Sequence, residues 1–380
     1  MSSVTGECDA RYGAVREVLA RNLGSGADLG VSVAVVEHGR LVVDLWGGFA
    51  TQDRRTSWTE KTITNVYSTT KTMVALVALM LIDRGQISPD DCVAKFWPEF
   101  EQNGKHAVTV AHLLSHTSGL PAWEQPFTLA DLYDYETATS RLASAAPWWK
   151  PGTASGYHMV NYGHLIGEVV HRVTGTRLGQ YFRDEIARPL GIDFHIGLPE
   201  VEHTRVSPVF MGEGPQMDLS QLPPDNFMLR TLVAPFIGGP DTVSTVAWRT
   251  AEIGGANGHG NARAVALAQS AITNRGLVGG KRLLSESTIA LTGTQMSDDV
   301  DLVLQLPLRF GLGYALSSPE YPLHSNENVR YWGGFGGSRI INLPDRGITF
   351  AYVMNKLKPG AILGDERGDE LFSAVLEAAN

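Results

Sequence analysis

The sequence predicts an α+β fold, with one antiparallel β-sheet built from both ends of the chain and helices on its faces. Near the N-terminus, the β-branched runs 31–36 and 41–45 flank a short polar turn containing Gly39, which predicts a hairpin. Near the C-terminus, 338–343 and 348–354 flank Pro344 to Gly347 and predict a second hairpin. Because each hairpin lies beside a terminal segment with helical apolar spacing, we expect both ends to share one sheet. These helices are expected at residues 10–23 and 366–378.

The middle of the chain is predicted to be an insertion. Its signals are mainly helical, with loops rich in proline and glycine between them. We therefore expect residues 1–75 and 240–380 to form the sheet domain, and residues 76–239 to form a mainly helical subdomain. An active site is expected in the cleft between the two, because ligand sites commonly occur at domain interfaces.

Composition excludes several classes of protein. Of the 380 residues, 43% are hydrophobic and 19% charged, which is typical of a chain that folds around a substantial core. The formal net charge is -9 and no basic cluster stands out, so a nucleic-acid partner is not expected. Cys8 and Cys92 match no metal or redox spacing.

The sequence also predicts a soluble, cytoplasmic protein with no membrane partner. Its first eight residues lack both the basic start and the apolar stretch of a secretory signal. The longest apolar run, residues 73–82, is about half of the roughly 20 residues that a spanning helix needs.

One helix carries a candidate for catalysis. It begins near Ser68 and is apolar on every face beyond its first turn, which predicts a buried central helix. Ser68 and Lys71 are three residues apart and so share a face. Burial and the helix dipole both lower the pKa of Lys71, toward a neutral amine beside a hydroxyl: a nucleophile and its base. The alternative is that Ser68 is only the N-cap, although a cap of this kind favours Glu or Gln three residues on, where Lys71 stands.

Four ordered segments strengthen the catalytic interpretation. They are residues 66–71 with the Ser-x-x-Lys pair, 112–120 (HLLSHTSGL), 151–153 with Tyr157 following, and 331–337 (YWGGFGG). Together they resemble the serine β-lactamase and penicillin-binding protein superfamily, and within it the esterases of β-lactamase fold, the family VIII carboxylesterases. The similarity spans nearly the whole chain and implies the β-lactamase/DD-peptidase-like fold.

The resemblance assigns roles to residues. It implies that Ser68 is the acylated nucleophile, Lys71 its partner and Tyr157 the family's tyrosine, leaving open which of the last two is the base. It also implies that the backbone amides of Ser68 and Phe335 form the oxyanion hole. The remaining candidates are expected to line the substrate pocket: Tyr67, Trp123, His158, Trp332, Gly333 and Gly334.

Two departures from the family pattern concern the substrate. Met159 stands where penicillin-recognising enzymes have an asparagine that holds a substrate amide. Trp332 begins the segment that is usually Lys-Thr-Gly, whose lysine binds a carboxylate. An indole cannot bind a carboxylate in that way but can wall an apolar pocket, so the Trp332 exchange favours neutral esters, while Met159 argues against recognition of a penicillin-type amide.

These observations predict a serine hydrolase that cleaves short-chain or small neutral carboxylic esters through an acyl-enzyme. The expected partner is a small-molecule ester, no metal or organic cofactor is expected, and the oligomeric state is not predicted. His112 and His116 are four residues apart, but Leu113 stands at the place of a zinc protease's glutamate, so we expect no metal there. Three alternatives remain open: acyl transfer, a β-lactamase or D-alanyl peptidase, and a non-catalytic binding protein.

Overall fold

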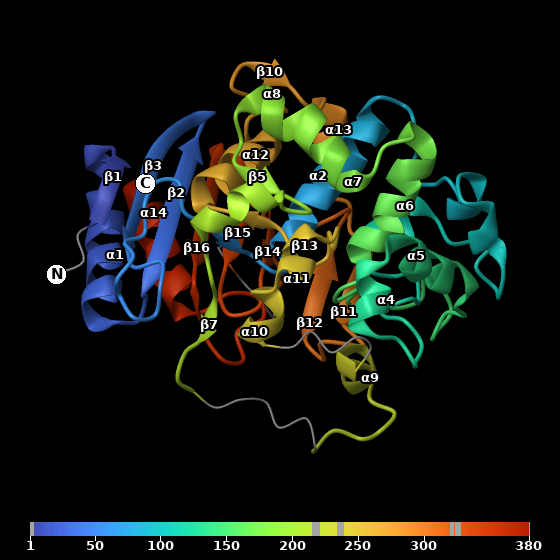
Figure 1. The fold of residues 1–380 in the computed structure, drawn as a ribbon. Helices are drawn as coiled ribbons and strands as arrows, with labels where there is room; N and C mark the ends of the chain where they lie inside the picture. Colours follow the sequence, from blue (N-terminus) through green and yellow to red (C-terminus); the bar gives the residue numbers. More distant parts are fainter. Residues whose placement is uncertain (1–3, 215–220, 234–238, 320–322, 324–327, 380) are drawn as a thin grey trace.

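The computed structural model describes residues 4–214, 221–233, 239–319, 323 and 328–379 (Figure 1). Within these ranges the largest sheet has nine strands, all paired antiparallel, in the order β1-β3-β2-β16-β15-β14-β13-β12-β11. Its strands are β1 (Val4–Cys8), β2 (Gly30–Glu37), β3 (Arg40–Gly48), β11 (Ser297–Val300), β12 (Pro307–Phe310), β13 (Ala315–Leu316), β14 (Arg330–Gly333), β15 (Arg339–Leu343) and β16 (Ile348–Met354). The predicted α+β fold is confirmed.

Both predicted hairpins are present, and they meet in the middle of the sheet. Strands β2 and β3 form the first hairpin, and β15 and β16 form the second. Strand β2 pairs with β16 in a register that sets Ala34 opposite Ala351, so the two ends of the chain share one sheet. Nearly every residue of β2 and β16 is buried, consistent with their β-branched, apolar sequences.

Helices cover both faces of this sheet. In β16, Thr349 Oγ1 lies 2.8 Å from Thr273 Oγ1 of α12 (Ala262–Thr273), while the ring of Phe350 packs 5.5 Å from that of Phe372 in α14 (Glu366–Ala379). Because successive strand residues point to opposite faces, α12 and α14 cover opposite sides. Helix α1 (Gly13–Ser25) packs against α14, and Figure 1 shows the two chain ends at the same end of the molecule.

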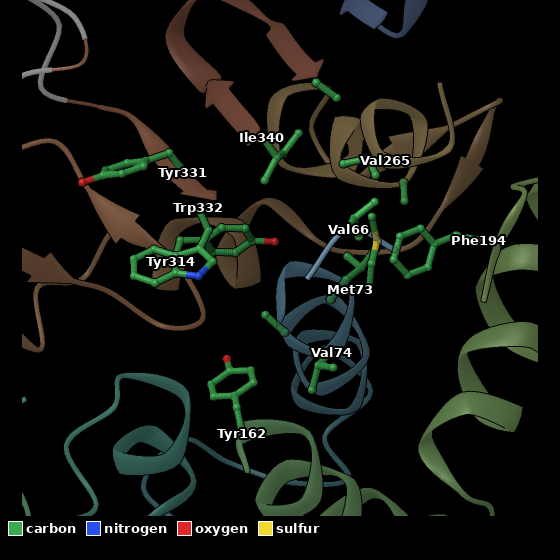
Figure 2. Packing of buried hydrophobic residues seen from close by; sticks show 14 of the residues in the cluster. Val66, Met73, Val74, Tyr162, Phe194, Val265, Tyr314, Tyr331, Trp332 and Ile340 are labelled. Atoms are coloured by element: carbon green, nitrogen blue, oxygen red, sulfur yellow. The ribbon is translucent and has the colours of Figure 1, made fainter. Parts of the chain in front are cut away.

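Helix α2 (Thr70–Asp83) is the buried central helix that the sequence predicts. All twelve of its residues from Thr70 to Leu81 are buried. Figure 2 shows Met73 beside Val66 and Phe194. The helix packs against α6 (Tyr162–Thr174), α7 (Leu178–Phe182) and α12, so its first turn lies deep in the protein.

The other elements are short. A second sheet, ordered β5-β8-β4-β6, contains β4 (Ile63–Asn65), β5 (Phe194–His195), β6 (Val206–Ser207) and β8 (His259–Gly260). Two pairs join β7 (Phe210–Met211) to β17 (Lys356–Leu357) and β9 (Leu277–Val278) to β10 (Lys281–Arg282). The remaining α-helices are α3 (Val110–Leu114), α4 (Leu129–Tyr133), α5 (Tyr135–Ser144), α8 (Arg188–Leu190), α9 (Phe227–Val233), α10 (Pro240–Val243), α11 (Val246–Thr250) and α13 (Glu286–Leu291).

The division into residues 1–75 with 240–380 and residues 76–239 stays a prediction. In the described ranges, no helix combines the length and apolar character that crossing a bilayer requires.

Candidate active site

Ser68 lies in the turn between β4 and α2, where the hairpin β14–β15 holds the chain. Ser338, directly before β15, donates its hydroxyl to Val66 O at 2.9 Å, and Ser338 Oγ also lies 3.0 Å from Thr69 Oγ1. Tyr67, directly before Ser68, has a φ of +46°, a left-handed conformation that non-glycine residues rarely adopt. Such strain is common at functional sites, where the surrounding structure holds it in place.

Gly334 allows this close approach of the hairpin. A Cβ atom at this position would lie 2.2 Å from Val66 O and 2.3 Å from Ser338 Oγ. Because both distances are far below van der Waals contact, any larger residue would push the hairpin away from the turn that carries Ser68. Gly333 is equally crowded, since its Cβ would meet the backbone of Leu363 at 2.7 Å.

Lys71 lies in the first turn of α2 and is almost completely buried. Its Nζ is 3.1 Å from Ser68 Oγ and donates to Met159 O at 2.7 Å and Gly255 O at 2.6 Å. Burial lowers the pKa of Lys71 well below its usual value, because removing an ammonium from water disfavours the charged form. The predicted contact between Lys71 and Ser68 is therefore present in the geometry.

Tyr157 lies next to the pair formed by Ser68 and Lys71. The face of its ring lies 4.6 Å from Lys71 Nζ, and its hydroxyl accepts a hydrogen bond from Trp332 Nε1 at 3.1 Å. Burial raises the pKa of Tyr157, and hydrogen bonds with Ser68 and Trp332 oppose part of this rise. The phenol is thus neutral at neutral pH and able to donate a proton.

Trp332 was predicted to wall an apolar pocket, and the structure adds a polar contact to that expectation. Its indole is buried in β14 and packs 5.0 Å from the ring of Tyr157 and 5.5 Å from that of Phe310. The N–H of the indole points at the hydroxyl of Tyr157. Sequence reasoning missed this contact, because 175 residues separate Trp332 from Tyr157.

Two backbone amides remain available near Ser68. Within the described part of the chain, neither Ser68 N–H nor Phe335 N–H donates to a backbone oxygen, although the N–H groups of Thr69, Gly334 and Gly336 do. Phe335 lies in the turn after β14, and its half-exposed ring packs edge-on at 5.6 Å against that of Tyr67. Free amides of this kind are what an oxyanion hole requires.

Two predicted pocket residues have contacts of their own. Trp123 lines a cavity of about 300 Å³ together with Trp148, Leu229 and Arg230, and Ser68, Lys71 and Tyr157 are not among the residues that line it. His158 is fully buried, and its ring nitrogens lie 2.8 Å from His116 Nδ1 and 2.6 Å from Ser118 Oγ. Its ring therefore has no free nitrogen to offer a substrate.

The two histidines of residues 112–120 have separate surroundings. His112 Nδ1 accepts the backbone N–H of Thr109 at the start of α3, while His116 contacts His158 and Tyr157. Among the described residues no group of three or more histidine, cysteine or acidic side chains is arranged to hold a metal ion. Cys8 and Cys92 are both free thiols.

The structure thus brings Ser68, Lys71 and Tyr157 together where the turn before the buried helix α2 meets the antiparallel sheet. A serine beside a buried lysine in a Ser-x-x-Lys pair is an arrangement found in serine hydrolases. Comparison with known proteins agrees. The sequence model of the Beta-lactamase family matches residues 15–371. This chain therefore belongs to the β-lactamase family.

Individual relatives match over nearly the whole chain. The esterase/beta-lactamase LipL of Mycobacterium tuberculosis (strain ATCC 25618 / H37Rv) is 34% identical, over 96% of this chain and 86% of LipL. The crystal structure of a family VIII carboxylesterase superimposes with a TM-score of 0.91 at 36% identity, covering 99% of both chains. A penicillin-binding protein homologue from Caulobacter crescentus superimposes with a TM-score of 0.88 at 35% identity, again over 99% of both chains. The predicted resemblance is confirmed.

Proposed function

We propose that this chain is a serine carboxylesterase of β-lactamase fold that hydrolyses small neutral esters through an acyl-enzyme on Ser68. The class of enzyme is supported by the similarity to LipL and to the family VIII carboxylesterase over nearly the full length of the chain. The roles of individual residues are supported by the site geometry.

The observation that carries the mechanism is the set of three contacts around Lys71 Nζ. A neutral amine has two N–H groups and one lone pair. Met159 O and Gly255 O accept the two N–H groups at 2.7 and 2.6 Å, which leaves the lone pair for Ser68 Oγ at 3.1 Å. With its pKa lowered by burial, Lys71 is positioned to take the hydroxyl proton of Ser68.

Lys71 is thus a better candidate for the base than Tyr157. Burial keeps Tyr157 protonated, so its hydroxyl has a proton to give, whereas only its phenolate could serve as the base. In the proposed sequence, Ser68 Oγ bonds to the ester carbonyl carbon while its proton moves to Lys71. The developing oxyanion accepts hydrogen bonds from the backbone amides of Ser68 and Phe335.

The bond between the carbonyl carbon and the alcohol oxygen then breaks, the leaving alcohol takes a proton from Tyr157, and the proton on Lys71 passes to Tyr157. Water attacks the acyl-enzyme and gives one proton to Lys71. The bond from the acyl carbon to Ser68 Oγ then breaks, Ser68 Oγ takes that proton back, and the carboxylic acid leaves. No metal or organic cofactor enters this scheme.

The preference for neutral esters rests on two side chains. Trp332 stands at the place of the lysine that binds a carboxylate in penicillin-recognising enzymes, and its one polar atom is already bonded to Tyr157. Met159 stands at the place of the amide-binding asparagine, and its backbone oxygen accepts a hydrogen bond from Lys71.

The test is turnover of p-nitrophenyl butyrate by wild type and by Ser68→Ala, with intact mass measured after treatment with a fluorophosphonate. We expect wild type to turn over the ester and gain one adduct, and Ser68→Ala to lose both while keeping its fold by circular dichroism. A Ser68→Ala variant that keeps most of the turnover would refute the assignment of the nucleophile.

One observation favours a second activity. LipL is described as both an esterase and a β-lactamase, so β-lactam hydrolysis is a candidate for this chain also. A chromogenic cephalosporin, assayed beside the ester with the same two proteins, measures it directly.

A further inference from the structure

The segment that carries Tyr157 is held by three successive backbone N–H groups. Gly156 N–H donates to His116 O at 2.9 Å, Tyr157 N–H donates to Asp301 Oδ1 at 3.1 Å, and His158 N–H donates to His116 Nδ1 at 3.1 Å. All three acceptors are distant in sequence, and two of them belong to one residue. The segment therefore cannot shift along its own axis without breaking several buried hydrogen bonds, each costly to lose.

His116 is itself held rigidly. Its backbone has a φ of +62°, and its ring packs 4.9 Å from the rings of Tyr157, Tyr162 and Phe310. The contact with Tyr157 is edge-on, at an interplanar angle of 61°. His116 thus contacts both the ring of Tyr157 and the amides on either side of it.

Hydrogen-bond valence assigns the protons of the neighbouring histidine pair. Because His116 Nδ1 accepts the backbone N–H of His158, this nitrogen carries no hydrogen. The hydrogen between the two Nδ1 atoms, 2.8 Å apart, must then belong to His158, so the single lone pair of His116 Nδ1 is shared by the backbone N–H and the ring N–H of His158. Its Nε2 is free of hydrogen in the neutral ring and accepts the hydroxyl of Ser118 at 2.6 Å. The chain Ser118–His158–His116 therefore keeps His116 Nδ1 an acceptor that faces the Tyr157 segment.

Asp301 holds the segment from the other side. It lies directly after β11, is fully buried, and its Oδ1 also accepts the amides of Val303 at 3.0 Å and Leu304 at 2.8 Å. These two bonds fix the carboxylate within its own loop. The bond to Tyr157 N–H then ties that loop to the active site.

We propose that His116 and Asp301 are positioning residues that hold the hydroxyl of Tyr157 in line with Ser68 and Trp332. The inference rests on the proposed function, in which Tyr157 protonates the leaving alcohol. Both residues act through Tyr157. They fix its backbone and ring, and because the ring is rigid, the position of its hydroxyl is fixed as well. Misplacement of a catalytic group by about 1 Å can cost about 10²-fold in rate.

The experiment is a double-mutant cycle on ester turnover. His116→Leu removes both the Nδ1 acceptor and the ring and leaves an apolar side chain of similar size, and we expect kcat to fall about 10- to 100-fold with KM little changed. His116→Asn places an amide oxygen near the position of Nδ1 and should restore most of kcat. His164→Leu is the matched control, because His164 is a buried histidine whose ring packs against Trp123 and Tyr135, and its kcat should stay near wild type.

The decisive arm repeats His116→Leu in a Tyr157→Phe background, where the hydroxyl to be positioned is gone. We expect little further loss of kcat there, because coupled residues are not additive. Equal losses in both backgrounds would overturn the inference while leaving the role of Tyr157 intact. A Tyr157→Phe variant with normal kcat would instead refute the proposed role of Tyr157, and the positioning role with it. If His116→Leu does not fold, the same cycle with Asp301→Ala decides between these outcomes.

Discussion

Replacing Trp332 with Phe tests whether its N–H supports the chemistry of Tyr157. The substitution keeps an aromatic wall and removes only the donor that lies 3.1 Å from the hydroxyl of Tyr157. In the resting enzyme the acceptor is a neutral phenol, for which a hydrogen bond contributes about 0.5–1.5 kcal/mol. When Tyr157 gives up its proton the acceptor becomes anionic, and such bonds contribute about 1.5–3 kcal/mol.

The difference between these two values, about 1–1.5 kcal/mol, is lost only in the transition state. It corresponds to a fall in kcat of roughly tenfold with KM nearly unchanged. The assay is steady-state hydrolysis of p-nitrophenyl butyrate by purified wild type and Trp332→Phe. Trp248→Phe is the matched control, because Trp248 is a buried tryptophan that donates its indole N–H to Asn65 Oδ1 at 3.0 Å. It should lose stability but not kcat.

A normal kcat in Trp332→Phe would refute this reasoning and reduce Trp332 to a wall of the pocket. In that case its effect would appear in selectivity alone. Trp332→Ala would then change the acyl-chain length preference without changing the rate on the best substrate.

Three further predictions follow from the same geometry. Because only the neutral form of Lys71 can accept a proton and burial lowers its pKa, kcat/KM should fall as the pH drops through that lowered pKa. Lys71→Arg stays protonated and should be inactive at every pH, which a pH–rate series of both proteins measures. Gly334→Ala places a Cβ 2.2 Å from Val66 O, so it should displace the oxyanion donor Phe335 N–H and lower kcat about 10²- to 10³-fold. Gly13→Ala, where a Cβ meets open space, should leave kcat unchanged. Burial lowers the pKa of His158 to about 3, so between pH 6.5 and pH 3 the unfolded chain binds a proton on this residue that the folded chain does not. The free energy of unfolding should therefore fall as the pH drops through this range, by about 1.4 kcal/mol per pH unit. Urea unfolding at several pH values measures this, and His158→Leu should show a weaker dependence.

The elements that could be predicted from sequence are those with a strong local pattern. The terminal hairpins and helices have β-branched runs or helical spacing, and they were found within a few residues of their predicted ends. The central helix was predicted because it is apolar all round. Its start differs: α2 begins at Thr70, the N-cap is Thr69, and Ser68 lies in the preceding turn with its hydroxyl toward Lys71. The alternative of Ser68 as a simple N-cap does not describe this arrangement.

What could not be predicted are contacts between residues far apart in the chain. His116 and His158 are 42 residues apart, and nothing in the spacing of either indicates that their Nδ1 atoms meet. Asp301 is 144 residues from Tyr157 and looks in sequence like one more acidic residue after a strand. The one available signal was adjacency, since His158 follows Tyr157 directly. That adjacency led us to expect His158 in the substrate pocket, whereas its ring is fully buried and contacts His116 and Ser118.

The contrast between Lys71 and Tyr157 explains why the proposed mechanism needs both. Burial acts on the two groups in opposite directions, lowering the pKa of the amine and raising that of the phenol, so each rests in its neutral form. One can then only accept a proton and the other only donate one, which separates the base from the acid without any carboxylate in the cluster. After the first transfer the ammonium of Lys71 keeps its bonds to Met159 O and Gly255 O and turns its third N–H toward Ser68 Oγ. A charged amine in this buried site is costly, and that cost favours returning the proton as the alcohol leaves.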